Sequence, residues 1–255
     1  MKAMILAAGL GTRLRPLTND CPKALVTVAG RTLLEIVLCR LRAFGVREVI
    51  INVHHHAGMI LDYLKAHHNF GMCIEVSREE VLLDTGGGLK KAAPFFLKDS
   101  ASSREPLLLH NVDVISAIDL ASMIQFHSER AALATLAVQD RETSRYLLFD
   151  EHGQLCGRRA GRAANAEDSK AELARPAARA QALAFAGIHV LSPAIFAKME
   201  EDGAFSIIDA YLRLAAQGEK IVAFRADECY WRDAGRPENL MQAALDLASG
   251  RYSIT

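Results

Sequence analysis

The first half of the chain alternates short apolar runs with segments whose apolar residues recur at helical spacing. The helical segments are Leu33–Phe44, Met59–His68 and about 120–130, and the first stops at a glycine. Strands are expected at five runs: Lys2–Ala7, Glu48–Val53, Cys73–Ser77, Leu107–Asn111 and Ala131–Val138. Strands that alternate with helices form βαβ units. The pattern predicts an α/β fold with a Rossmann-like mixed, mostly parallel sheet flanked by helices.

The pattern changes after about residue 140. Two strand-like runs, Tyr146–Asp150 and Gln154–Gly157, flank a short polar turn and predict a β-hairpin. Residues 158–181 are rich in alanine and charge, so we expect an exposed, mobile segment, with weak helix as the alternative. Further elements are expected at Ala182–Leu191, a helix at Ile207–Ala216, a strand at Ile221–Arg225 and a helix from Pro237 to Ser249. A single domain over 1–255 with a small β-rich insertion is the simplest organisation.

Charge and cysteine content exclude several classes of protein. Thirty basic residues balance thirty acidic ones, which argues against binding to nucleic acid or an anionic membrane. No segment approaches the roughly 18 uninterrupted apolar residues of a membrane span. The five cysteines are widely spaced without a C-x-x-C pair, which is typical of a reduced protein rather than a disulfide or zinc framework. We therefore expect a cytoplasmic protein.

A glycine-rich basic loop follows the first expected strand. It lies at the carboxyl edge of the sheet, where open α/β folds bind ligands. Gly9 and Gly11 allow backbone N–H groups to approach a phosphate chain, and Arg13, Arg15 and Lys23 supply positive charge. A plain turn with solvated arginines is the alternative. Three cations, two glycines and two prolines within the 15 residues from Gly9 to Lys23 favour a polyphosphate loop.

Two familiar phosphate loops do not match this segment. A dinucleotide fingerprint needs G-x-G-x-x-G, but Leu14 occupies the third position and Pro16 soon interrupts a helix. A Walker loop needs Gly-Lys-Ser/Thr, and the sequence has Gly11-Thr12-Arg13. An NAD-binding function is therefore weakly supported.

The ordered run Ala7-Ala8-Gly9-Leu10-Gly11-Thr12-Arg13-Leu14-Arg15-Pro16-Leu17-Thr18, followed by Pro22-Lys23, resembles the signature of the sugar-1-phosphate nucleotidyltransferase superfamily. The resemblance implies a glycosyltransferase-A-like fold that joins a nucleoside triphosphate to a sugar 1-phosphate and releases pyrophosphate. It implies a nucleotide-binding half at 1–140, a sugar-binding half at 141–235 and a C-terminal helix at 236–255. It also implies that Arg13 binds the β- and γ-phosphates, that Lys23 contacts the α-phosphate region, and that the nucleotide lies on Leu6, Ala7, Ala8, Gly9, Gly11 and Thr12.

Two carboxylates are candidate ligands for Mg²⁺. Asp113 directly follows a buried strand, and Asp233 lies far along the chain in Trp231-Arg232-Asp233-Ala234-Gly235. Oxygen ligands suit Mg²⁺, which keeps several waters and substrate phosphate oxygens. A helix N-cap is the alternative for Asp113, but Asp119 is better placed to cap the next helix. The family has metal-binding aspartates in both motifs, which implies the same role for Asp113 and Asp233.

Other motifs point to the sugar side of such a site. Asp84-Thr85-Gly86-Gly87-Gly88 precedes a short expected helix and is similar to the Glu-Thr-Gly-Gly-Gly of muramate-type uridylyltransferases. These enzymes and the mannose-1-phosphate guanylyltransferases are the nearest named relatives in pattern. The resemblance assigns Gly87 and Gly88 to the nucleotide, and Asp84, Thr85, Asn111 and Gly187 to the sugar phosphate. The family's Glu-Lys-Pro is missing; Arg158 or Arg159 either replaces its cation or is a solvated charge.

No general base is required by the implied reaction, because a phosphate monoester is already mostly dianionic at neutral pH. His54, His55 and His56 are adjacent and are expected to be structural, and His110 is expected in the core. Two other functions stay open: a phosphocholine-type cytidylyltransferase, which needs a cage for a quaternary ammonium, and a nucleotide-sugar sensor without turnover. The expected partners are small molecules, with a homodimer left open.

Overall fold

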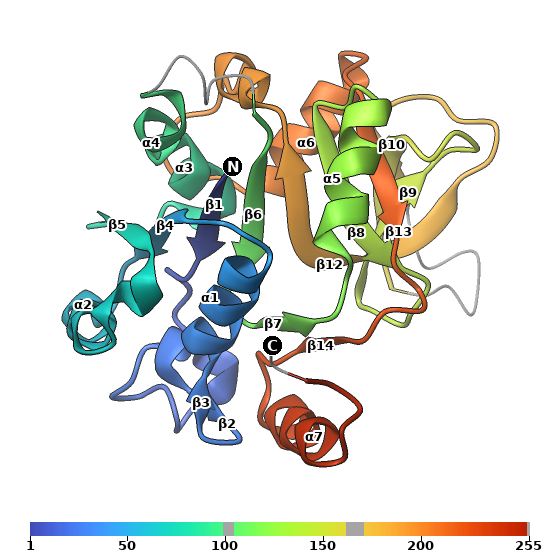
Figure 1. Ribbon diagram of the computed structural model, residues 1–255. Helices are drawn as coiled ribbons and strands as arrows, with labels where there is room; N and C mark the ends of the chain where they lie inside the picture. The colour runs from blue at the N-terminus through green and yellow to red at the C-terminus, as the bar shows by residue number, and fades with distance from the viewer. Residues whose placement is uncertain (99–104, 162–170, 254–255) are drawn as a thin grey trace.

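The computed structural model describes residues 1–98, 105–161 and 171–253. Within these residues a ten-stranded mixed sheet runs in the order β11-β10-β9-β12-β6-β1-β4-β5, with β8 and β13 joined to it beside β12 (Figure 1). Its strands are β1 (Lys2–Leu6), β4 (Glu48–Val53), β5 (Cys73–Arg78), β6 (Leu107–Asn111), β8 (Ala134–Gln139), β9 (Arg145–Phe149), β10 (Leu155–Ala160), β11 (Ala171–Leu173), β12 (Gln181–Leu191) and β13 (Ile221–Arg225). The mixed sheet agrees with the predicted fold class.

Helices and two small ribbons complete the described chain. The α-helices are α1 (Leu33–Ala43), α2 (Ala57–Ala66), α3 (Asp84–Lys91), α4 (Ala93–Leu97), α5 (Leu120–Glu129), α6 (Ile207–Ala216) and α7 (Pro237–Ala248). The short 3-10 helices are η1 (Thr12–Leu14), η2 (Lys23–Leu25), η3 (His68–Gly71) and η4 (Pro193–Lys198). The ribbons pair β2 (Thr27–Val28) with β3 (Arg31–Thr32), and β7 (Val114–Ser116) with β14 (Trp231–Asp233). No helix in the described ranges is long and apolar enough to cross a membrane.

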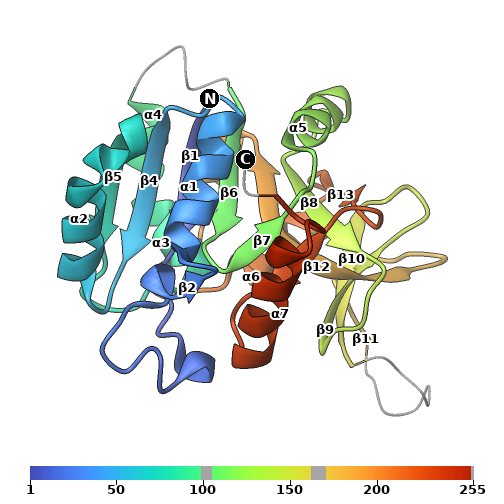
Figure 2. The same cartoon turned by 60° about the horizontal axis from the view of Figure 1, so that its bottom comes forward.

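The N-terminal half of the sheet is parallel and covered on both faces. Strands β5, β4, β1 and β6 lie side by side in register (Figure 2). Side chains alternate along β1, so Ile5 packs with α1 and α2 on one face while Met4 packs with α3, α4 and α6 on the other. A strand buried on both faces is mostly apolar, which explains why β1, β4 and β6 were predictable from the sequence; the edge strand β5 is only partly buried.

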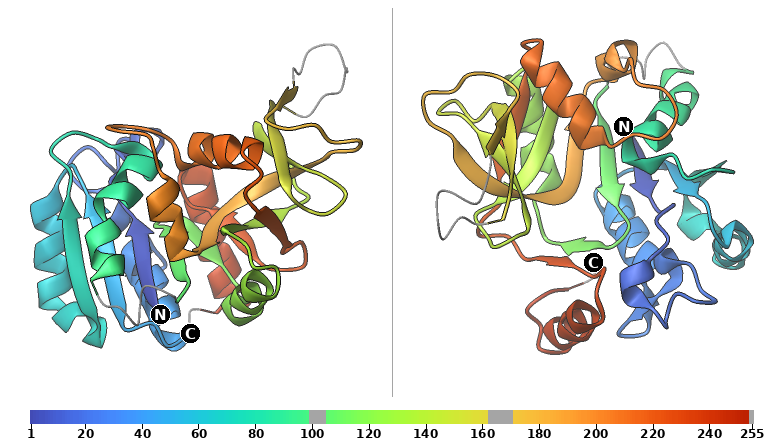
Figure 3. Two further views of the ribbon diagram at one scale, coloured as in Figure 1. Left: turned by 90° about the horizontal axis from the view of Figure 1, so that it is seen from above. Right: turned by 180° about the vertical axis from the view of Figure 1, so that it is seen from behind.

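Strand β12 joins the two halves of the sheet. Its end at Ile188–Leu191 pairs antiparallel with β6, and its start at Gln181–Ala184 pairs with β9. The register with β8 shifts between Phe185 and His189, and Gly187 lies in this shift with φ +75°. A residue with a side chain rarely adopts that conformation, so the glycine permits the bend. Beyond the bend, β9, β10 and β11 project away from the parallel strands (Figure 3).

Two expectations from the sequence need correction. The segment 158–181 is partly strand, because β10 continues to Ala160 and pairs with β11; positions 162–170 lie outside the described residues. Alternating strands with exposed charged side chains give no apolar pattern, so composition misled the prediction. The three glycines at 86–88 lie inside α3 rather than before it. Glycine is normally disfavoured in the interior of a helix, but here close packing against neighbouring segments requires glycine at these positions.

Three buried histidines make folding sensitive to acid. Burial and then the nearby Arg40 charge lower the pKa of His110 to about 4, and burial lowers the pKa of His127 to about 4. Burial and the His110 charge lower the pKa of His189 to about 3. The unfolded chain therefore binds more protons below about pH 6.5. The stability from these neutral histidines is complete above that pH and is lost as pH falls toward 4.

We predict that the free energy of unfolding falls by about 1.4 kcal/mol per pH unit for each of these histidines between about pH 6 and pH 4. Urea unfolding at pH 7.5, 6 and 5 measures this slope. His127→Gln can keep a hydrogen bond to Thr135 Oγ1, which lies 2.9 Å from His127 Nδ1, but cannot titrate. Its slope should be shallower than that of the wild type. Equal stability of the wild type at pH 7.5 and pH 5 contradicts the prediction.

Candidate active site

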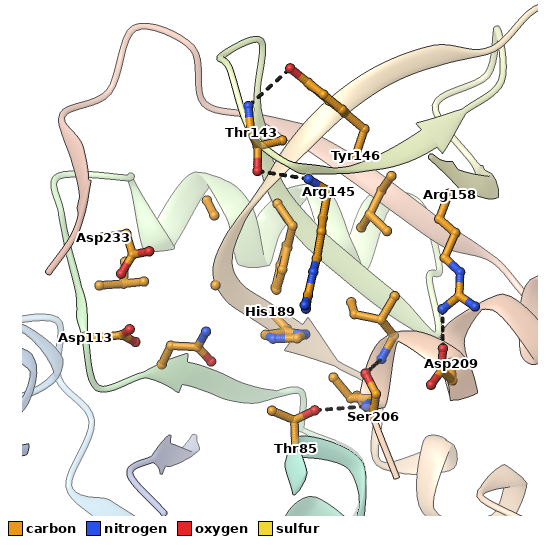
Figure 4. A pocket seen from close by; sticks show the side chains of 18 of the residues that line it. Thr85, Asp113, Thr143, Arg145, Tyr146, Arg158, His189, Ser206, Asp209 and Asp233 are labelled. Atoms are coloured by element: carbon orange, nitrogen blue, oxygen red, sulfur yellow. Dashed lines mark hydrogen bonds and ion pairs between the residues drawn. The ribbon is translucent and has the colours of Figure 1, made fainter. Parts of the chain in front are cut away.

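A cleft of about 750 Å³ lies at the bend of β12. Residues from both halves line it, including Asn111 at the end of β6, Ile207 at the start of α6 and Thr85 at the start of α3, which is labelled in Figure 4. Several lining residues therefore lie at the ends of strands or the beginnings of helices. Open α/β sheets bind ligands at such carboxyl edges, which makes this cleft the candidate site.

The glycine-rich loop packs beside the base of the cleft. Gly11 has φ +64°, and a methyl group there would lie 3.0 Å from Thr18 Cγ2 and 3.2 Å from Lys23 Cβ. Thr18 Oγ1 donates to the Gly11 carbonyl oxygen at 2.8 Å, and Ala7 N–H donates to Asn52 Oδ1 at 2.8 Å. Arg13 is the part of this loop that lines the cleft. Leu6, Ala7 and Ala8 are buried, whereas Gly9 and Thr12 are exposed.

Four charged groups from distant segments meet at this base. The ribbon of β7 and β14 pairs Asp233 with Val114, and the Ala234 N–H donates to the Asp113 carbonyl oxygen at 2.8 Å. Lys23 forms an ion pair with Asp113, and Arg13 Nη1 lies 3.8 Å from Asp233 Oδ2. Backbone pairing, rather than side-chain attraction, therefore places the two carboxylates together.

The two carboxylates have opposite pKa shifts. Burial raises the pKa of Asp113, but the charge and hydrogen bond of Lys23 outweigh burial and hold it below its ordinary value. Burial and then the negative charge of Asp113 raise the pKa of Asp233. The charges of Lys23 and Arg13 lower the pKa of Asp233 but do not outweigh these two effects. A cation or a proton would relieve the repulsion.

The side chains of Asp113, Asp233 and Arg13 converge beside Gly235. A methyl group at Gly235 would lie 2.7 Å from Asp233 Oδ1, 2.8 Å from Arg13 Nη2 and 3.0 Å from Asp113 Oδ2. The Gly235 N–H also donates to Asp233 Oδ1 at 2.7 Å. The absence of a side chain at Gly235 therefore leaves the space in which three charged groups face one another.

The four residues expected to bind the sugar phosphate all line the cleft: Asp84, Thr85, Asn111 and Gly187. A methyl group at Gly187 would lie 2.8 Å from Val114 Cγ2 and 2.9 Å from Asn111 Nδ2, so the glycine lets Asn111 pack against β12. Thr85 Oγ1 accepts from the Ile207 N–H at 3.0 Å and caps α6. Asp84 has φ +58° and accepts from the Thr85 N–H at 2.6 Å.

Packing explains the triple glycine without a ligand. A methyl group at Gly86 would lie 2.3 Å from the Phe205 ring. A methyl group at Gly87 would lie 2.3 Å from the Gly203 carbonyl oxygen, and one at Gly88 would lie 2.8 Å from Asn52 Nδ2. The Gly86 N–H donates to the Phe205 carbonyl oxygen at 2.9 Å. Gly87 and Gly88 are buried and do not line the cleft. The expectation that these glycines precede the helix is wrong, because they lie inside α3.

Sequence reasoning missed Arg141 and Arg145. Arg141 stacks on Trp231 with its guanidinium carbon 3.6 Å from the ring centre, and it donates to the Phe185 carbonyl oxygen at 2.8 Å. The Nε of Arg141 is buried without a hydrogen-bond partner in the described chain. Arg141 follows the end of β8, so the strand-end argument applied to Asp113 could have found it.

The two arginines considered as replacements for the missing lysine differ. Arg158 Nε lies 2.7 Å from Glu172 Oε2 and its Nη1 lies 2.5 Å from Asp209 Oδ1, so its charge is neutralised. Arg159 lies over the Tyr146 ring at 5.5 Å, with a buried Nε that has no partner within the described residues.

The mixed sheet and the charged cleft at its carboxyl edge define a nucleotide-binding class of α/β enzyme. The family model described as "Nucleotidyl transferase" matches residues 2–250, and the chain belongs to this family. The chain is accordingly a nucleotidyltransferase, and its family relatives act on sugar 1-phosphates.

Two relatives show the range of the family. The N-acetylmuramate alpha-1-phosphate uridylyltransferase of Caulobacter vibrioides is 34% identical over 96% of both chains. The mannose-1-phosphate guanylyltransferase of Mycobacterium tuberculosis is 28% identical over 97% of this chain and 65% of its own length.

Solved structures agree on the fold. HddC from Yersinia pseudotuberculosis, complexed with GMP-PN, has a TM-score of 0.73 at 22% identity, covering 96% of this chain and 99% of its own. UDP-glucose pyrophosphorylase complexed with UDP-glucose has a TM-score of 0.73 at 19% identity, covering 98% and 99%.

We predict that Gly235→Ala lowers nucleotidyltransferase kcat by about 10²-fold, because the new methyl displaces Asp233, Arg13 or Asp113 by a fraction of an ångström to an ångström. The melting temperature should change little, since the displaced atoms are the ends of side chains. Gly58→Ala is the matched control, because a methyl there meets nothing within 4 Å. Turnover and thermal unfolding of both variants test this. Full activity of Gly235→Ala contradicts the convergence described above.

Proposed function

We propose that this chain transfers a nucleoside monophosphate from a nucleoside triphosphate to a sugar 1-phosphate, with UTP and N-acetylmuramate 1-phosphate as its substrates. The observation that carries the proposal is the convergence of Asp113, Asp233 and Arg13 on the point beside Gly235, with Lys23 paired to Asp113. The 34% identity over nearly the whole chain to a muramate-type uridylyltransferase supports this choice of substrates over GTP and mannose 1-phosphate.

The donor set at this point suits Mg²⁺. Two carboxylates meet there. Burial and then the negative charge of Asp113 raise the pKa of Asp233, and a divalent cation would offset the repulsion between the two groups. Asp113 and Asp233 would hold the ion, leaving its other positions to water and phosphate oxygens. When bound, Mg²⁺ supplies positive charge to the phosphate chain.

The chain's own residues then position two polyanions for in-line attack. Arg13 and the basic loop hold the leaving phosphates, and Lys23 lies at the attacked α-phosphate. Arg141 holds the sugar phosphate in place of the family lysine, because it is anchored on Trp231 and lies beside the cleft with an unpartnered Nε. The sugar phosphate oxygen attacks as a dianion, so no side chain has to remove a proton.

Two other functions are less well supported. A phosphocholine-type cytidylyltransferase needs an open aromatic face for a quaternary ammonium, but Arg141 covers Trp231, the chain's single tryptophan, at 3.6 Å. A sensor without turnover has no need of the full set of charged groups, and Asp113, Asp233, Arg13 and Lys23 come together in the described chain.

A pyrophosphate-release assay tests the substrates. UTP, dTTP, GTP, CTP and ATP are combined with N-acetylmuramate, mannose and glucose 1-phosphates, in Mg²⁺ and after chelation. We expect turnover with UTP and N-acetylmuramate 1-phosphate that is lost on chelation. Binding of Mg²⁺–UTP without any turnover supports the sensor instead.

We predict that Asp113→Asn lowers kcat by about 10²–10³-fold, because one preorganised charge at the phosphates is removed while the side-chain shape is kept. Asp119→Asn is the matched control: Asp119 lies in the same segment but caps α5 by accepting from the Ala121 and Ser122 N–H groups at 2.9 and 3.1 Å. Its kcat should match that of the wild type. Near-normal pyrophosphate release from Asp113→Asn contradicts the metal assignment.

A further inference from the structure

The sugar half of the cleft contains more positive charge than one sugar phosphate requires. Arg141, Arg145, Arg158 and Arg159 all line it. Arg158 is neutralised by Glu172 and Asp209, whereas the guanidinium groups of Arg141, Arg145 and Arg159 have no ion-pair partner among the described residues. A phosphate monoester brings close to two negative charges at neutral pH. A neutral sugar 1-phosphate therefore leaves part of this charge without an opposite ion.

The position of Arg145 separates it from the phosphate. Figure 4 shows its side chain reaching into the pocket, which His189 also lines, and in that view the guanidinium is set apart from Asp113 and Asp233. His189 is neutral, because burial lowers its pKa to about 3, so it does not compete for an anion. The same figure shows Arg158 directed at Asp209 instead.

The backbone of Arg145 is held in place although its side chain is exposed. It begins β9, whose next residue, Tyr146, is buried and pairs with Ala184 of β12. The Arg145 N–H donates to Thr143 Oγ1 at 3.3 Å, and the small Ala160 faces Arg145 across the hairpin. The guanidinium is thus presented from an anchored strand into open space.

We propose that Arg145 binds a carboxylate carried by the sugar itself, so that the chain selects an acidic sugar 1-phosphate over its neutral counterpart. This proposal rests on the proposed function and deepens it. Arg141, next to Trp231 and Asp233, holds the 1-phosphate, while Arg145 lies on the part of the cleft that the sugar ring and its substituents occupy. A guanidinium matches a carboxylate with two parallel hydrogen bonds.

The test compares two substrates that differ only in this group. N-acetylmuramate 1-phosphate carries a lactyl carboxylate that N-acetylglucosamine 1-phosphate lacks. The ratio of their kcat/KM values is measured with UTP and Mg²⁺ for the wild type, Arg145→Met and Arg158→Met. Arg158→Met is the matched control, because it removes an arginine that already has two acidic partners.

The wild type should prefer the acidic sugar, and Arg145→Met should reduce that preference by about 10- to 100-fold, mainly through KM, as expected for a lost charge-assisted hydrogen bond. Arg145→Lys should restore part of it, and Arg158→Met should keep the wild-type ratio. An unchanged ratio in Arg145→Met, or a wild type without any preference for the acidic sugar, overturns the proposal.

Calorimetric binding of the two sugar phosphates separates this inference from the proposed function. If no pair of substrates gives pyrophosphate, the proposed reaction fails, but binding can still be compared. Tighter binding of the acidic sugar phosphate that disappears in Arg145→Met supports the carboxylate site without turnover. Equal binding of both sugar phosphates to the wild type, or a preference that Arg145→Met retains, overturns it.

Discussion

The bend of β12 at Gly187 is the constraint on which the cleft depends. One strand pairs with β6 through Ile188–Leu191 and with β9 through Gln181–Ala184, so the parallel half and the hairpin half share a backbone. A side chain at Gly187 would collide with Asn111 and Val114, both of which line the cleft. The same glycine therefore turns the sheet and brings the end of β6 against the wall of the cleft.

Electrostatics at the cleft follow from backbone pairing. The ribbon of β7 and β14 holds Asp113 and Asp233 together despite their repulsion, and Lys23 and Arg13 offset only part of it. The far side of the cleft carries the guanidinium groups of Arg141, which follows β8, of Arg145 on β9, and of Arg158 and Arg159 on β10. Two anionic substrates each need positive charge nearby: the guanidinium groups supply it on one side, and a cation held by Asp113 and Asp233 would supply it on the other.

Local sequence patterns predicted most of the parallel half. Strands β1, β4 and β6 are mostly apolar because both of their faces are covered, and Asp119 was recognisable as the cap of α5. The hairpin half was harder to predict. Strand β11 is exposed and charged, and the three glycines of α3 have a helical conformation that only the contacts with Phe205, Gly203 and Asn52 explain. Secondary-structure propensity depends on the residue type and its neighbours along the chain. The conformations of β11 and of the α3 glycines depend on contacts with residues that are distant in sequence.

The sequence by itself determined the alternation of strands and helices, the basic loop before Lys23 and the resemblance that led to Asp113 and Asp233. Each of these features is a continuous run of residues, so it can be recognised in the sequence without knowledge of the residues that pack against it. Only the tertiary structure decided that Arg158 is neutralised, that Arg141 stacks on Trp231 and that Arg145 faces the open cleft. An arginine has the same charge in any sequence, but what that charge can bind depends on the groups that folding places beside it.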